Sequence, residues 1–202
     1  MGLYERYVFP HILDLAMRRM EPLRAEALAP AAGDVLEIGF GTGLNLAHYP
    51  DRVRRLCAID PMRALERRVA ERIAAAPFPV ERHALRADGA LPFENARFDC
   101  AAMTWTLCTI PDPIAALREI RRVLRPGAPL VFIEHGRSDD ARVARFQDLW
   151  NPIQKVIGAG CNANRKIDAL VREAGFELEK LDRFQADGPR ILAEMYRGVA
   201  RG

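Results

Sequence analysis

The sequence predicts an α/β fold in which a mostly parallel sheet has helices on both faces and ends in an antiparallel hairpin. Short apolar segments alternate with helical patterns along most of the chain, which is typical of parallel strands with right-handed crossovers. The chain has 202 residues, 50% of them hydrophobic, so it can bury the core of one domain but is short for two. We expect a single domain over 1–202, with a helical lid at 1–30, a core at 33–136 and further helices and strands at 137–202.

Five apolar segments have the length and composition of buried strands. They lie at 34–39, 54–60, 80–86, 98–104 and 128–134. Helices are expected around them at 3–20, from 44, and at 61–76, 113–125, 139–157 and 165–174. Pro10 interrupts the apolar spacing of the first helix, whereas Pro61 and Pro113 suit the first turns of theirs, the latter after the N-cap Asp112.

Two extended segments, at 176–184 and 190–199, end the chain. The residues between them, which include Asp187-Gly188-Pro189, are too few for a crossover helix. These last two strands are therefore expected to pair antiparallel.

A glycine-rich loop follows the first predicted strand. That strand contains Glu37, and glycines then occupy alternate positions at Gly39, Gly41 and Gly43. Glycine adopts strained dihedrals and lets a ligand approach the backbone, so a strand, this loop and a helix start form a nucleotide-binding arrangement.

The spacing of the loop excludes two common nucleotide-binding motifs. A dinucleotide fingerprint requires a glycine where this chain has Leu44, and a Walker loop requires Lys and Ser or Thr after its last glycine, where this chain has Leu44 and Asn45. The remaining pattern is E-x-G-x-G-x-G.

Two aspartates end the next two predicted strands. Asp60 lies about twenty residues after the glycine loop, where a carboxylate suits two ribose hydroxyls. Asp88 follows the third strand. The alternative for each is an N-cap of the next helix.

These segments resemble, in order, the motifs of the class I S-adenosylmethionine (SAM) methyltransferases. The E-x-G-x-G-x-G pattern resembles motif I, and Ala87–Gly89 resembles the adenine-binding segment. The segment Phe98–Thr104 resembles motif IV, and Leu117–Gly127 resembles the helix and turn before strand five. The matches extend over 33–136.

The resemblance implies a Rossmann-like sheet of seven strands, with SAM as cofactor and S-adenosylhomocysteine as product. It implies that the methionine part lies on the glycine loop, the ribose at Asp60 and the adenine at Asp88. Glu37 would order the loop or meet the ammonium group, and Phe40 would pack near it. The cofactor-binding residues implied are Glu37, Gly39, Phe40, Gly41, Gly43, Asp60, Pro61, Asp88, Gly89 and Thr104.

A narrower resemblance includes both ends of the chain. The segments Tyr4–Pro10, Trp105–Ile110, Glu134–Gly136, Trp150–Pro152 and Gly160–Asn162 resemble the methyltransferase-like 7 proteins, which are alkyl thiol S-methyltransferases, and their bacterial relatives. The resemblance implies a thiol acceptor. The hydrophobic membrane segment that precedes the first helix in the mammalian proteins has no counterpart here, so attachment of that kind is not expected.

Few residues are candidates for acting on the acceptor. His135 ends strand five, on the side where open α/β sheets bind ligands, and Cys108 follows strand four, so both are candidates for catalysis. The candidates for substrate binding are Tyr7, His11, Trp105 and Cys161. A structural hydrogen bond for His135 and packing roles for the others are the alternatives.

Composition and charge limit the partners. The net charge is +3, and arginines alternate with acids as on solvated helix faces, so nucleic acid is not an expected partner. The cysteines Cys57, Cys100, Cys108 and Cys161 have no C-x-x-C pairing or matching histidine spacing, and we expect no metal site. No apolar run approaches a membrane span and no signal pattern follows Met1, so a cytoplasmic location is expected.

The predicted function is methyl transfer from SAM to a small molecule, with a thiol as the preferred acceptor. The alternatives are N-, O- or C-methylation of a lipid, quinone or amine, and a cofactor-binding module without catalysis. A nucleic-acid methyltransferase is disfavoured because Thr104–Leu107 lacks the Asn/Asp-Pro-Pro-Tyr/Phe motif. The first helix is amphipathic and packing against the protein is favoured, with peripheral membrane contact as the alternative. The sequence predicts no oligomeric state.

Overall fold

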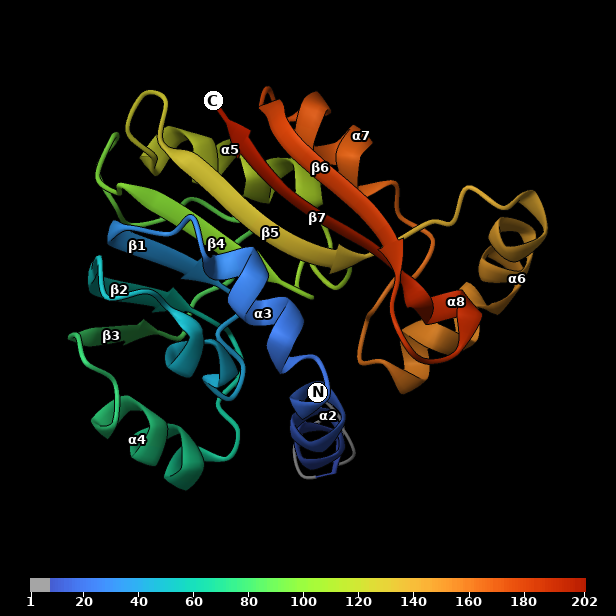
Figure 1. Ribbon diagram of the computed structural model, residues 1–202, viewed down its shortest axis with the longest axis horizontal. Coiled ribbons are helices and arrows are strands. Elements are labelled where there is room, and N and C mark those ends of the chain that lie inside the picture. Colours follow the sequence, from blue (N-terminus) through green and yellow to red (C-terminus); the bar gives the residue numbers. More distant parts are fainter. Residues whose placement is uncertain (1–7) are drawn as a thin grey trace.

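Seven strands form one twisted sheet that runs through the molecule (Figure 1). The computed structural model describes residues 8–202. The strands are β1 Gly33–Ile38, β2 Val53–Ile59, β3 Val80–His83, β4 Cys100–Thr104, β5 Pro129–His135, β6 Glu177–Gln185 and β7 Glu194–Arg201. The helices are α2 Phe9–Arg18, α3 Glu21–Leu28, η1 Leu44–His48, α4 Glu66–Ala74, α5 Pro113–Val123, α6 Ala141–Ile157, α7 Ile167–Glu173 and α8 Arg190–Ala193, of which η1 is a 3₁₀ helix.

The predicted fold class is confirmed. The strand order is β3-β2-β1-β4-β5-β7-β6, with the first five strands of the chain parallel. β7 pairs antiparallel with both β5 and β6, as the short connection predicts. The chain reverses its direction of travel across the sheet between β1 and β4, and open α/β sheets bind ligands at that point.

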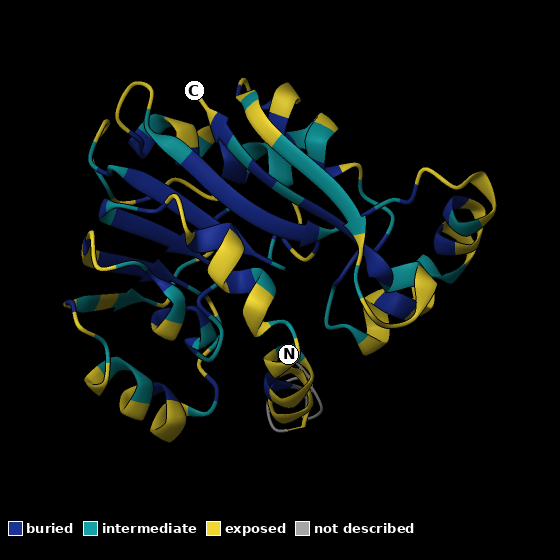
Figure 2. Ribbon diagram, viewed as in Figure 1, coloured by how far each residue is buried: buried dark blue, intermediate teal, exposed yellow. Residues whose placement is uncertain are grey.

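Alternate residues of the central strands pack against helices on opposite faces. On one face, Leu36 and Ile38 of β1 join the core formed with α5 and α7. On the other, Val35 packs in a second cluster with residues of α3, η1 and α4. Figure 2 shows the resulting buried sheet between partly exposed helices. A strand buried on both faces must be apolar at nearly every position, which explains the apolar runs in the sequence.

The helix predicted to begin at Pro61 begins five residues later. Residues 61–65 form a loop, and α4 starts at Glu66. The Asp60 carboxylate accepts a hydrogen bond from the Met62 backbone N–H, which turns the chain as it leaves β2. Leu65 then adopts a left-handed conformation, with φ of 52°, that a continuous helix cannot contain.

The N-terminal helical region also differs from its prediction. Pro10 lies in the first turn of α2 and does not interrupt it, because that turn needs no backbone donor. The predicted helix over 3–20 ends at Arg18, and its first residues, with Leu3 and Tyr7, lie outside the described residues. A second helix, α3, which was not predicted, follows with Pro22 in its first turn.

Smaller differences affect the edges of elements. β3 and β4 are shorter than predicted, and Phe98 forms only an isolated bridge with Leu124. Part of the segment predicted as the last strand is the short helix α8. The predicted cap is confirmed, since the Asp112 carboxylate accepts from the Ala115 N–H at 2.9 Å.

A buried polar cluster lies beneath the glycine loop. The Glu37 carboxylate, on β1, accepts hydrogen bonds from Asn45 Nδ2 at 2.8 Å and from the Tyr49 hydroxyl at 2.9 Å. Arg24, on α3, donates to Asn45 Oδ1 at 2.6 Å and to Thr104 Oγ1 at 3.0 Å. The cluster thus joins α3, β1, η1 and β4, and it satisfies a carboxylate that would otherwise be costly to bury.

No helix among residues 8–202 combines the length and the apolar character needed to cross a membrane.

Substituting Gly198 by Ala should destabilise the sheet. Gly198 lies in β7 opposite Phe132 of β5, and an added Cβ would lie 2.5 Å from the Phe132 ring and 2.8 Å from the Lys180 carbonyl oxygen. We expect a loss of about 1–3 kcal/mol in the free energy of unfolding, measured by urea denaturation, because the core must shift to admit the methyl group. Gly89→Ala is the matched control, since no atom lies within 4 Å of its added Cβ; an equal loss in both variants would contradict the packing argument.

Replacing Glu37 by Gln should flatten the pH dependence of stability. Burial raises the pKa of the Glu37 carboxyl from 4.5 to about 7, against the lowering effect of its hydrogen bonds. A raised folded-state pKa means that the stability present below pH 4.5 is lost as the pH rises towards 7, by an amount on the order of 3 kcal/mol. Urea midpoints at pH 5 and pH 8 should therefore differ more in the parent than in Glu37→Gln, and parallel changes in the two proteins would contradict the assignment.

Candidate active site

A cavity of about 740 Å³ lies at the carboxyl ends of the parallel strands. Its wall includes the last residues of four of them, Ile38, Ile59, Thr104 and His135. Helix α2, the loop after α6 and residues 187–189 complete the wall. The strand arrangement therefore places the predicted ligand-binding edge around a space large enough for an organic ligand.

The glycine loop forms one wall of the cavity, and its glycines have different roles. Gly39 has φ of 80°, and an added Cβ would overlap the Thr106 side chain, so the loop packs closely on the segment after β4. Gly41 has φ of 55° with no atom within 4 Å of an added Cβ, which leaves its backbone open to the cavity. Gly43 donates its N–H to the Phe40 carbonyl at 2.9 Å and does not line the cavity.

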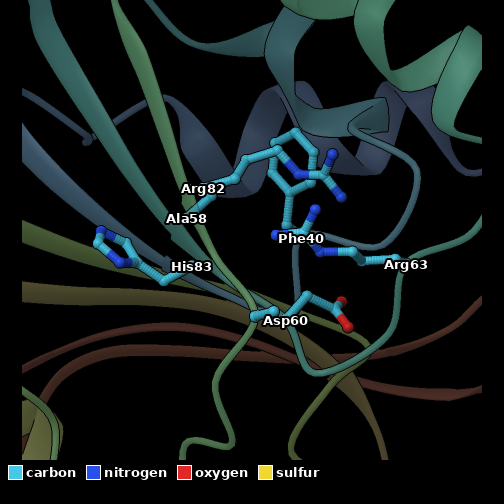
Figure 3. A pocket seen from close by; sticks show the side chains of 7 residues that line it. Phe40, Ala58, Asp60, Arg63, Arg82 and His83 are labelled. Atoms are coloured by element: carbon cyan, nitrogen blue, oxygen red, sulfur yellow. The ribbon is translucent and has the colours of Figure 1, made fainter.

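The Asp60 carboxylate connects the end of β2 with the glycine loop. It accepts from the Gly41 N–H at 2.7 Å and from the Met62 N–H at 2.8 Å, and burial raises its pKa. Both oxygens keep a lone pair for a further donor. Asp60 lines the main cavity and also a small hollow, shown in Figure 3.

That small hollow is not a ligand site. Its volume of about 10 Å³ holds about one water molecule. Figure 3 shows the Phe40 ring beside Arg82, whose guanidinium lies 5.2 Å from the ring centroid. Phe40 is buried in the core and also lines the main cavity.

Asp88 lines the cavity with both carboxylate oxygens paired to Arg86. The distances are 3.0 Å from Arg86 Nε and 2.7 Å from Arg86 Nη2, and the hydrogen bonds with this guanidinium lower the pKa of Asp88. Asp88 is thus held as an anion that can still accept from a base through its second lone pairs.

A strained turn after β4 presents the residues of the far wall. Trp105 has φ of 51°, which is unfavourable for a bulky side chain and is found where surrounding structure imposes it. Glu134 Oε1 holds this turn by accepting from the N–H groups of Thr106 at 2.8 Å and Leu107 at 3.0 Å. Burial raises the pKa of Glu134 to about 8.

Arg24 is a site residue that the sequence patterns did not single out. Its side chain is buried, lines the cavity and lies 4.7 Å from the centroid of the Trp105 ring. Burial lowers the pKa of Arg24 to about 10, and its Nε has no hydrogen-bond partner. A buried arginine with an unsatisfied donor beside a glycine loop fits the carboxylate of a ligand. The surrounding sequence, EPLRAEAL, mixes charged and apolar residues and does not set Arg24 apart.

Three side chains with metal-ligand atoms meet at the other end of the cavity. Cys108 Sγ, His135 Nε2 and Cys161 Sγ all lie within 4.8 Å of one another, and His135 Nε2 is 2.9 Å from Cys161 Sγ. A hydrogen bond from Cys161 and the neighbouring His135 lower the pKa of Cys108, whereas the pairing with Cys108 and burial raise that of Cys161. Burial acts to lower the pKa of His135, but the Cys108 sulfur reverses this and the net shift is upward.

Helix α2 covers the glycine loop through one buried carboxylate. Asp14 accepts from Thr42 Oγ1 at 2.6 Å and from Arg72 Nη1 at 2.8 Å, which joins α2 to the loop and to α4. Although burial opposes it, these hydrogen bonds lower the pKa of Asp14 to about 2. Leu13 and Met17 face the cavity.

The structure brings most of the predicted site residues to one cavity. Those that line it are Gly39, Phe40, Gly41, Asp60, Pro61, Asp88, Thr104, Trp105, Cys108, His135 and Cys161. Glu37 lies beneath the loop in the polar cluster, and Gly43 and Gly89 are outside the wall. His11 is exposed on α2 and does not line the cavity, and Tyr7 lies outside the described residues.

The cavity fits an adenosyl ligand with a charged amino-acid tail. It has an open glycine backbone at Gly41, a carboxylate at Asp60 for hydroxyl donors, and a buried cation at Arg24 for a carboxylate. The space then extends past Trp105 to the cluster of Cys108, His135 and Cys161, where a second molecule can lie.

Comparisons with known proteins agree with this geometry. A family model described as a methyltransferase domain matches residues 4–181. Human thiol S-methyltransferase TMT1B is 31% identical over 200 residues, which cover 89% of this chain and 78% of that protein.

Solved structures show the same fold. The [4+2]-cyclase SpnF superposes with a TM-score of 0.69 at 21% identity, covering 91% of this chain and 79% of the other. The N-methyltransferase NodS from Bradyrhizobium japonicum, solved with S-adenosylhomocysteine, has a TM-score of 0.65 at 20% identity, covering 92% and 86%. Taken with the matched family model and the fit of the cavity to SAM, these likenesses lead to one conclusion: the chain belongs to the class I SAM-dependent methyltransferases and is an enzyme of that family, similar to the thiol S-methyltransferases.

Proposed function

We propose that this enzyme transfers the methyl group of SAM to the sulfur of a small thiol. The observation that carries the proposal is the continuous cavity, which connects the glycine loop with the cluster of Cys108, His135 and Cys161. The name of the relative TMT1B supports the same acceptor. SAM supplies a methyl group already activated on a sulfonium, so the protein mainly has to align the acceptor and exclude water.

The cofactor half of the site is assigned from the groups on its wall. We assign the ribose hydroxyls to the Asp60 carboxylate, which lines the cavity and also accepts from the Gly41 backbone N–H. We assign the carboxylate of the methionine part to the guanidinium of Arg24, because this cation lines the cavity. Asp88, held by Arg86, faces the adenine end.

The acceptor half lies between Trp105 and the cluster. Trp105 is fixed by its strained turn and by Arg24 above its ring, so it offers a rigid wall beside the path of the methyl group. Cys108 and His135, the candidates for catalysis, end this half of the cavity together with Cys161. Helix α2 borders the cavity through Leu13, Ala16 and Met17, whose apolar side chains limit the contact of a bound ligand with water.

A lipophilic acceptor is the second candidate. Helix α2 and the end of α6, which both border the cavity, expose large apolar side chains to solvent. These are Val8 just before α2, Ile12, Leu13 and Leu15 on α2, and Phe146, Leu149, Ile153, Val156 and Ile157 on α6. Such faces suit an enzyme that takes its acceptor from a lipid surface.

Asp60→Ala should weaken binding of both SAM and 5′-methylthioadenosine by about tenfold or more. Both ligands carry the ribose, and a lost charge-assisted pair of hydrogen bonds costs at least ~1.4 kcal/mol. Isothermal titration calorimetry measures both affinities, with circular dichroism to confirm the fold. Unchanged affinities would exclude Asp60 as the ribose acceptor.

Arg24→Gln should change the affinities for two ligands by different amounts. It should weaken S-adenosylhomocysteine binding about tenfold or more while leaving 5′-methylthioadenosine, which lacks the amino-acid part, within about twofold. Arg19→Gln, at an exposed position after α2, is the matched control. Equal losses for both ligands would mean that Arg24 supports the loop and does not bind the carboxylate.

The acceptor is tested by incubating the protein with SAM and panels of small thiols, phospholipids, quinones and amines. Formation of S-adenosylhomocysteine, quantified by mass spectrometry, should depend on the thiols. Turnover only with a lipid, quinone or amine would reject the thiol acceptor and favour the second candidate, while the cofactor assignments would stand.

A further inference from the structure

The cluster of Cys108, His135 and Cys161 joins three distant parts of the chain. Cys108 lies in the turn after β4, His135 is the last residue of β5, and Cys161 lies in the loop after α6. Both cysteines are buried and His135 is partly buried, and all three line the cavity. The cluster is therefore sheltered from bulk water but accessible to a molecule in the cavity.

Hydrogen bonds outside the cluster hold its three parts in place. The Cys108 carbonyl accepts from the backbone N–H of Asn162 at 2.9 Å and from its Nδ2 at 3.0 Å, which ties the turn to the loop. Asn151, on α6, donates to Asn162 Oδ1 at 3.1 Å and accepts from the Ala163 N–H at 3.1 Å. The side chains are thus presented by a built frame and not by mobile loops.

The loop conformation itself is specific. Gly158 lies where an added Cβ would be 2.8 Å from the Gln154 carbonyl oxygen and 3.0 Å from Cys161 Cβ. Ala159 and Gly160 both have positive φ, of 49° and 97°. This tight reversal of the chain directs Cys161 back towards His135. The backbone strain that it requires is of a kind found at functional sites.

The ligand atoms suit a soft or borderline divalent ion. Zinc binds thiolate at ~2.3 Å and imidazole at ~2.0–2.1 Å, so tetrahedral ligands lie roughly 3.5–3.8 Å apart. The atoms here lie within 4.8 Å of one another, and the 2.9 Å between His135 Nε2 and Cys161 Sγ has to widen by less than ~1 Å. Three protein ligands with one side open is the composition of a catalytic zinc site.

We propose that Cys108, His135 and Cys161 bind Zn²⁺, with the fourth coordination position open to the cavity. Binding releases the thiol protons of the two cysteines to solvent. The zinc site is inferred from this geometry alone. The role of its open coordination position depends on the proposed thiol acceptor.

In that role, the acceptor thiol binds as a thiolate and gives its proton to solvent. A new carbon–sulfur bond forms between this sulfur and the methyl group as the sulfonium carbon–sulfur bond breaks, and that electron pair stays on the departing sulfur. The neutral thioether product is a weaker ligand than the thiolate and leaves the ion.

The test measures metal content and a cobalt spectrum. Protein purified with reductant and loaded with Zn²⁺, then passed through a desalting column, should retain about one ion per chain by inductively coupled plasma mass spectrometry. Cys108→Ser, Cys161→Ser and His135→Ala should each reduce this towards zero. Cys57→Ala, at a buried cysteine within β2, is the matched control and should retain the ion.

Co²⁺ in place of Zn²⁺ reports the ligands directly. The parent protein should show thiolate-to-cobalt charge transfer and the intense visible bands of tetrahedral Co²⁺, and a small thiol should shift these bands. Competition with a chromophoric chelator gives the affinity of the parent protein, so the test survives if a variant fails to fold.

No retained ion and no cobalt spectrum in protein with all thiols reduced would overturn the proposal. A Cys108–Cys161 disulfide that persists in reductant, seen by mass spectrometry, would also overturn it. Zinc binding without thiol turnover would keep the site and reject the thiol acceptor, whereas thiol turnover by zinc-free protein would keep the acceptor and reject the role of the ion in binding it.

Discussion

The buried carboxylate of Glu37 is the constraint on which the cofactor side of this enzyme depends. An anion in the middle of a doubly covered sheet is stable only with donors around it, and Asn45 of η1 and Tyr49, the residue after η1, supply them. Asn45 in turn accepts a hydrogen bond from Arg24, whose positive charge stabilises the Glu37 carboxylate. The helix that carries Arg24, α3, therefore has to pack on the same face of the sheet as η1. One polar group thus determines where α3, η1 and the glycine loop lie relative to β1.

Much of the fold was predictable because local signals agreed with the final packing. The strands β1, β2, β4 and β5 are largely buried on both faces, and each contains a run of apolar residues that is easy to recognise, although charged residues such as Glu37 in β1 and Glu134 in β5 interrupt the pattern. Asp112 before Pro113 is a local cap that forms as predicted. The helix predicted to start at Pro61 starts later. The Asp60 carboxylate accepts from the Gly41 N–H of the glycine loop and from the Met62 N–H, and the second bond forms a turn where the helix was expected.

The positions of the candidate site residues were predictable only where a strand and the residues that follow it can be recognised in the sequence. The loop from Gly39 to Gly41 and the strand-end Asp60 lie where their spacing indicates, because parallel strands end at a common edge. Arg24 could not be predicted, since its burial depends on a helix that packs against three other elements. The proximity of Cys108 to Cys161 could not be predicted either. Sequence spacing identifies metal ligands that lie in one segment, whereas these two cysteines are brought together by tertiary packing.

The attachment of α2 combines charged and apolar contacts. This helix turns much of its apolar surface outwards, with Leu15 70% and Ile12 54% exposed, and it is joined to the loop and to α4 through Asp14. Moving it off the cavity would separate the Asp14 carboxylate from Thr42 and Arg72 and would expose Leu13 and Met17, which line the cavity. Because the Asp14 carboxylate is buried, salt screens its ion pairs only weakly, so the helix keeps its position on the cavity over a wide range of ionic strength.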